Sequence, residues 1–161
     1  MLVDYNSLPN TARVWVYQSD RKFEKDDLAV IKEEATEFIN SWTRHGDDLK
    51  GGYTVLHNQF LILALDESFA NASGCSIDSS VRFIKKIESQ LSVDLMNKLN
   101  VSFKDGENIN IVPLADFQKY AKTDKICSET IVFNNMVQTK GEMATKWQVA
   151  AKNSWHQRFL N

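Results

Sequence analysis

The sequence predicts an α+β protein in which two main amphipathic helices cover an antiparallel or mixed sheet. Short segments rich in β-branched and aromatic residues recur along the chain, as in RVWVY at 13–17 and TIVF at 130–133. In two longer segments, residues 28–42 and 77–91, apolar residues recur three and four positions apart, which is the period of a helix. The run FLILAL at 60–65 is apolar throughout, as is typical of a central strand covered on both faces.

The first predicted helix follows the strand at 13–17. Asp26 or Asp27 fits its N-cap, and His45-Gly46 marks its end. Its apolar stripe consists of Leu28, Ile31, Ala35, Phe38 and Trp42. Because Phe38 and Trp42 belong to this stripe, we expect both to be buried in the core.

Strands at 53–56 and 60–65 precede the second helix, for which Ser76 is the predicted N-cap. The apolar stripe of that helix consists of Ile77, Val81, Ile84, Ile87 and Leu91. A hairpin of residues 101–104 and 108–112 turns at Asp105-Gly106, and a short helix at 114–122 and a strand at 130–133 follow. From Glu142 onward the pattern is ambiguous.

The first six predicted elements follow the β-α-β-β-α-β order of a ferredoxin-like fold, so the rest of the chain would be a C-terminal addition. Nothing in the composition marks a domain boundary, which predicts a single domain over residues 1–161.

Composition narrows the class of function. The net charge of −2 argues against nucleic acid as a partner, because phosphate binding requires a basic excess. The longest apolar run, residues 60–65, is too short to span a membrane, and no signal peptide is evident at the start. Two cysteines are too few for a disulfide framework or a zinc site, and no metal or cofactor motif is present. We therefore expect a cytoplasmic protein without metal or cofactor, and its oligomeric state stays open.

The candidate site lies where a buried strand ends in Asp66-Glu67-Ser68 and a loop of small residues, 73–76, opens into the second helix. A helix N-terminus favours a bound anion and lowers the pKa of a nearby thiol, so both an anion pocket and a reactive Cys75 are consistent with this pattern. Ordinary helix capping explains the same residues. The predicted ligand-binding residues are Asp20, Arg21, Asp66, Cys75, Ser76, Ser79 and Arg82, with Asn134, Asn135 and Lys140 as weaker candidates.

These residues leave three hypotheses open. The first is a non-catalytic binding or regulatory domain with a polar pocket at 73–82 for a small anionic ligand or a peptide. The second is a thiol-dependent enzyme with Cys75 as the catalytic residue, which needs a base from His45, His57 or His156, none of which has a diagnostic spacing to Cys75. The third is a subunit of an assembly that uses exposed aromatic residues as its interface.

The segments ARVWVYQSDR (12–21), SWTRHG (41–46), LDESFANASGCSIDSSVRF (65–83), VFNNMVQTKGE (132–142) and NSWHQRF (153–159) together resemble a small bacterial family found in Bacteroidota. Its members are often labelled "ABC transporter ATPase", and the family has no established activity. A P-loop requires G-x-x-x-x-G-K-[ST], and neither Lys50-Gly51-Gly52 nor Lys140-Gly141-Glu142 fits it. We therefore expect no ATPase activity.

Overall fold

The computed structural model describes residues 1–68 and 70–161, and it confirms the α+β class. Contacts divide the chain into two compact units. The N-terminal unit comprises Met1–Met96 with Gln138–Gly141, and the C-terminal unit comprises Asn97–Val137 with Glu142–Asn161. Each unit has a sheet and an apolar core, so they are described separately. The single domain expected over residues 1–161 stays a prediction.

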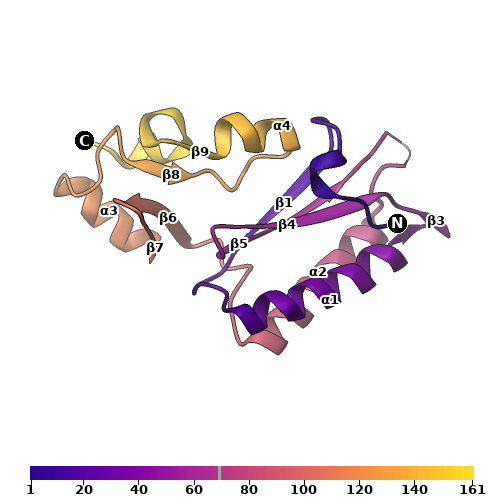
Figure 1. Ribbon diagram of the computed structural model, residues 1–161. Helices are drawn as coiled ribbons and strands as arrows, with labels where there is room; N and C mark the ends of the chain where they lie inside the picture. Colours follow the sequence, from indigo (N-terminus) through magenta and orange to yellow (C-terminus); the bar gives the residue numbers. More distant parts are fainter. Residues whose placement is uncertain (69) are drawn as a thin grey trace. The chain divides into compact units, whose positions relative to one another are not determined.

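The sheet of the N-terminal unit is antiparallel, with the strand order β1-β5-β4 (Figure 1). Its strands are β1 (Arg13–Gln18), β4 (Gly51–Leu56) and β5 (Phe60–Leu65), close to the predicted ranges. β5 lies in the middle, and every one of its side chains is buried, as its unbroken apolar run predicts. His57 and Asn58, with φ of 54° and 51°, form the turn between β4 and β5.

Two long helices, α1 (Lys25–Ser41) and α2 (Gly74–Leu91), cover one face of this sheet (Figure 1). Their apolar stripes pack against odd-numbered side chains of the strands, such as Tyr53 and Leu61. The predicted N-cap of α1 is wrong by two or three positions, because Glu24 holds that place. Asp27 completes the first turn instead, where its Oδ2 accepts the Glu24 N–H at 2.8 Å.

The predicted end of the first helix is also too late. α1 ends at Ser41, and a short hairpin of β2 (Thr43–Arg44) and β3 (Asp47–Asp48) follows. His45 and Gly46, with φ of 52° and 88°, form its turn. A His-Gly pair with positive φ suits a two-residue hairpin turn as well as a helix C-terminus, and this explains the difference.

The strand order and the two helices on one face agree with a ferredoxin-like arrangement. The segment that the sequence predicted as the fourth strand of this sheet is wrong. Residues 101–104 lie in β6 (Asn100–Asp105), which belongs to the C-terminal unit. Residues 138–140 run antiparallel beside the outer edge of β1 instead. There the Val14 N–H donates to the Gln138 carbonyl and the Lys140 N–H donates to the Ala12 carbonyl, both at 2.9 Å. A strand pattern predicts a strand but not its partner, and β6 pairs with its own hairpin neighbour.

Two adjacent glycines allow close packing at the start of β4. A Cβ at Gly51 would lie 3.3 Å from Cγ2 of Ile39, and a Cβ at Gly52 would lie 2.8 Å from the carbonyl oxygen of Val3. Residues 1–3 run beside this point, where the Val3 N–H donates to the Gly51 carbonyl at 2.9 Å. A short 3-10 turn, η1 (Tyr5–Ser7), comes next.

The sheet of the C-terminal unit has the strand order β7-β6-β8-β9 (Figure 1). β6 and β7 (Asn108–Pro113) form the predicted hairpin, and Gly106 adopts a φ of 63° in its turn. α3 (Leu114–Lys122) and β8 (Ile131–Phe133) match their predicted ranges closely. α4 (Lys140–Glu142), whose first two residues belong to the N-terminal unit, leads into the ambiguous stretch. That stretch continues with a π-helical turn at Met143–Trp147, β9 (Gln148–Ala150) and 3-10 turns at Ala151–Asn153 and Trp155–Phe159.

The core of the C-terminal unit contains a fully buried histidine. The ring of His156 stacks on Trp155 with centroids 3.7 Å apart and lies 5.4 Å from that of Phe117. Its Nδ1 is 2.8 Å from Oγ of Ser154, and among the described residues its Nε2 has no hydrogen-bond partner. Burial lowers the pKa of His156 from 6.5 to about 4. His156 is therefore a packing residue that is neutral in the folded protein near neutral pH.

This burial predicts acid sensitivity. In the unfolded chain His156 binds a proton as the pH falls below 6.5, whereas in the folded chain it binds one only near pH 4. The free energy of unfolding is therefore highest above pH 6.5 and decreases as the pH falls from 6.5 to about 4. From about pH 7.5 to about pH 4.5 we expect a loss of roughly 2–3 kcal/mol from this group. Chemical denaturation of the wild type and of His156→Gln checks it. The wild type should lose more stability on acidification, and equal losses would contradict the assignment.

Candidate functional site

The predicted site segment begins with a helix cap. Ser73, and not the predicted Ser76, is the N-cap of α2. Oγ of Ser73 accepts the Ser76 N–H at 3.2 Å, and Oγ of Ser76 accepts the Ser73 N–H at 2.6 Å. Ser76 is buried, and its carbonyl accepts the Nε1–H of Trp42 at 2.9 Å. These contacts give Ser76 a structural role that fixes the start of α2 against the end of α1.

Cys75 and Arg82 are exposed residues of α2. Cys75 is the second residue of the helix, and its thiol is not in a disulfide. Nη2 of Arg82 donates to Oγ of Ser79 at 3.0 Å, and that hydroxyl donates to the Cys75 carbonyl at 2.9 Å. The guanidinium is thus connected to the backbone of Cys75 and not to its sulfur.

The three histidines occupy different places. His45 is exposed in the hairpin turn after α1, and that hairpin packs near α2 through β2. His57 lies before β5, whose six residues span about 20 Å, whereas α2 follows the opposite end of that strand. His156 belongs to the C-terminal unit. None of the described hydrogen bonds or ion pairs joins His45 to Cys75.

Asp66 is held by the loop that follows β5. It is buried, and its Oδ1 accepts the backbone N–H of Ser68 at 3.0 Å and the Ser68 hydroxyl at 2.5 Å. Its Oδ2 lies 3.9 Å from Nζ of Lys50. The hydroxyl of Ser68, more than the other contacts, holds the pKa of this carboxyl below its usual range. The neighbouring Glu67 accepts the Ala72 N–H at 3.1 Å, so both carboxylates shape the loop.

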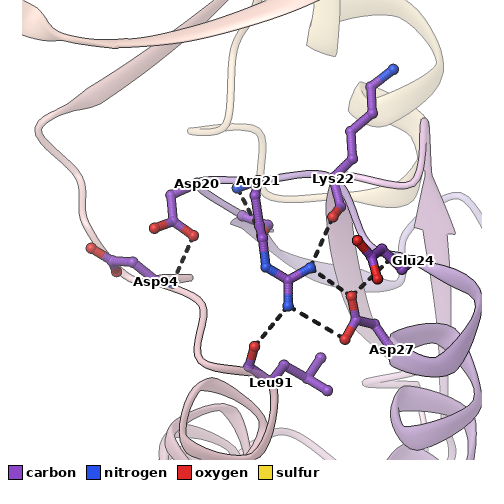
Figure 2. Close-up of polar contacts among 8 residues, drawn as sticks. Asp20, Arg21, Lys22, Glu24, Asp27, Leu91 and Asp94 are labelled. Carbon is purple, nitrogen blue, oxygen red and sulfur yellow. Dashed lines mark hydrogen bonds and ion pairs between the residues drawn. The ribbon is translucent and has the colours of Figure 1, made fainter.

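Arg21 joins the ends of the two long helices (Figure 2). Its Nη1 donates to Oδ2 of Asp27 at 2.6 Å and to the Lys22 carbonyl at 3.0 Å, and its Nη2 donates to the Leu91 carbonyl at 2.7 Å. Asp27 lies in the first turn of α1, and Leu91 is the last residue of α2. The guanidinium lowers the pKa of the Asp27 carboxyl. The donors that an anion would need are thus engaged within the fold.

Asp20 pairs with the segment after α2 (Figure 2). Its Oδ1 accepts the Asp94 N–H at 3.0 Å, and its own N–H donates to the Asp94 carbonyl at 3.2 Å. Asp20 and Arg21 therefore hold the end of α2 to the end of β1.

The weaker candidates also make internal contacts. Nζ of Lys140 donates to the carbonyls of Asn6 and Leu8 at 3.0 and 2.6 Å, within the N-terminal unit. Oδ1 of Asn135 accepts the Nε1–H of Trp147 at 2.9 Å, within the C-terminal unit. In that same unit, Oδ1 of Asn134 accepts the Met136 N–H at 3.2 Å, as in an Asx turn.

A groove between α1 and α2 brings Ser79 and Arg82 together. Its volume is about 350 Å³. Aromatic side chains line it, with the rings of Phe38 and Phe83 stacked at a centroid distance of 4.6 Å and an interplanar angle of 3°. The ring of Trp42 lies 5.1 Å from that of Phe38. Polar and charged side chains complete the lining: Glu34, Glu37, Ser41, Thr43, Ser79, Arg82 and Lys86.

The charges of this groove are only partly paired. Nζ of Lys86 lies 2.6 Å from Oε2 of Glu34, and this contact lowers the pKa of Glu34 and raises that of Lys86. Arg82 contacts a hydroxyl, and no carboxylate of the described residues lies within ion-pair distance of it. Of the two cations that line the groove, Arg82 is therefore the one without a carboxylate partner among the described residues.

The sequence did not identify the α1 side of the groove. Phe38 was expected to be buried in the core. It packs against two core clusters, but it is only half-buried and also lines the groove, whereas Trp42 is buried as predicted. The signal that could have been used is the position of Phe38 and Phe83 at the margin of both apolar stripes. Glu34 and Lys86, which pair across the helices, stand beside these positions.

Metal ligation, membrane insertion and similarity to known proteins assign no further role to these residues. Within residues 1–68 and 70–161 no group of three or more His, Cys, Asp or Glu side chains could hold a metal ion. No helix of the described chain has the length and apolar character needed to cross a membrane. Comparison with known proteins finds no matching family model, no matching curated protein and no matching solved structure.

The partial exposure of Phe38 predicts a modest cost for its removal. Phe38→Ala should destabilise the protein by about 1–2 kcal/mol, whereas the same change at the fully buried Phe60 should cost about 3–5 kcal/mol. Chemical denaturation of both variants measures the difference. An equal loss of stability in both variants would mean that the Phe38 side chain is fully buried and does not line the groove.

Proposed function

We propose that this protein is a non-catalytic binding domain, and that the groove between α1 and α2 holds a small ligand with a flat apolar part and a single negative charge. The proposal rests on the observation that Arg82 and the stacked rings of Phe38 and Phe83 line one groove. Aromatic walls with a few fixed polar groups are typical of small-molecule sites.

The charges around the groove support a monoanion over a polyanion. Arg82 offers a planar pair of donors that suits a carboxylate or sulfonate. Glu34 and Glu37 line the same groove and would repel a second or third negative charge. This argument also disfavours ATP, in keeping with the missing P-loop.

The enzyme alternative has weaker support. Cys75 is exposed, but its described surroundings include no imidazole that could act as its base. The exposed thiols of Cys75 and Cys127 fit a reducing compartment, and we therefore keep a cytoplasmic location as part of the proposal.

The test uses 8-anilinonaphthalene-1-sulfonate, an aromatic monoanion whose fluorescence rises in apolar sites. We expect saturable binding to the native protein, weakened at least fivefold in Arg82→Gln because the charge that pairs with the sulfonate is lost. Lys85→Gln is the matched control, since Lys85 is an exposed cation of α2 outside the groove lining. Equal weakening in both variants, or no saturable binding while near-UV circular dichroism reports a native fold, would contradict the proposal.

A further inference from the structure

The outer edge of β4 presents backbone groups that β5 does not use. The Gly51 N–H and carbonyl bond to Met1 and Val3 on the outer side, while the Lys50 carbonyl accepts the Asp66 N–H on the β5 side. Backbone groups alternate between the two sides of a strand, so those of Tyr53 and Val55 also point outward. Among the described residues no backbone segment pairs with either of them.

A wide groove of about 640 Å³ runs along this edge. Leu28, Ile31 and Lys32 of α1 line it on one side, and residues 2–5 line it on the other. Leu28 and Tyr53 are half-buried, and Ile31 is buried. The groove is thus an open channel with a strand edge at its base and an apolar helix face along one wall.

The start of this edge already pairs with the same chain. Leu2 and Gly51 form a single parallel bridge, flanked by hydrogen bonds of Met1 and Val3 to Gly51, and η1 then packs against the start of β4. The remaining edge, residues 53–56 (YTVL), has no charged residue and no proline. Charged residues and prolines on an edge strand usually prevent the addition of another strand.

We propose that the β4 edge is a docking site for an extended peptide segment of another protein, which adds a strand beside Tyr53–Val55. This inference rests on residues other than those of the α1–α2 groove. A strand added here places every second side chain toward α1. Leu28 and Ile31 favour an apolar side chain there. Lys32, which is exposed and has no ion pair among the described residues, favours an acidic side chain two positions away on the α1 side, while Asp4 lines the opposite wall and disfavours an acidic side chain there.

A proline on the strand edge tests the site directly. Because the Val55 N–H points away from β5, Val55→Pro removes the outward donor while the β4–β5 ladder is kept. Val55→Thr is the matched control, since it keeps the N–H and the β-branched shape. The probe is a phage-displayed library of random heptapeptides, followed by binding measurements with the synthetic peptides that are enriched.

We expect the enriched peptides to have an apolar residue two positions from Asp or Glu. They should bind the Val55→Pro variant at least tenfold more weakly than the wild type, and they should bind Val55→Thr with an affinity within about twofold of the wild type. If Val55→Pro fails to fold, N-methylation of single peptide bonds replaces it, and binding by wild type should be lost at alternate positions only. No enrichment, or binding insensitive to both changes, would overturn the proposal. A concentration-dependent dimer in sedimentation that Val55→Pro abolishes would overturn it in favour of pairing between two copies.

Discussion

The burial of β5 on both faces is the constraint on which the N-terminal unit depends. Every residue of FLILAL is buried, so the strand must be central, with a neighbour on each side and a cover on each face. Its odd-numbered side chains meet the stripes of α1 and α2, which share an apolar cluster with Leu61. Since each buried leucine or isoleucine side chain contributes about 1.5–3 kcal/mol, this strand organises much of the stability of the unit.

The positions of both candidate sites follow from that arrangement. Because two helices cover one face side by side, a groove lies between them, and Phe38 and Phe83 form its floor. Because β5 is central and residues 138–140 run along β1, β4 is left as the other edge of the sheet. The residues at the helix ends keep α1 and α2 in place relative to each other. Arg21 illustrates this, since it joins Asp27 of α1 to the last carbonyl of α2 (Figure 2).

Periodic patterns made most of the fold predictable. The stripes of both long helices, the run FLILAL and the Asp-Gly hairpin depend on local spacing, and each corresponds to an observed element. The pairing of residues 138–140 with β1 could not be predicted, because it joins segments more than 120 residues apart and carries no local signal. The site was harder still. Arg21 and Asp66 have the residue types of a ligand site. The partner of Arg21, Leu91, lies 70 residues away and becomes visible only when the chain is folded, whereas Ser68 binds Asp66 from two positions away, in a local turn. Only Ser79 and Arg82 of the predicted set line the groove, and Phe38 joins them because it lies at the edge of its stripe.

We propose that a small amphipathic anion binds over the Phe38–Phe83 stack without undergoing a reaction. The most direct measurement is a titration of the isotope-labelled protein with 8-anilinonaphthalene-1-sulfonate, followed by backbone amide shifts in NMR. We expect the shifts to concentrate at residues 34–43 and 79–86, on both sides of the groove. The sulfonate should form no covalent adduct, and dialysis should remove it completely. Shifts confined to the C-terminal unit, or to the cap at residues 73–76, would contradict it.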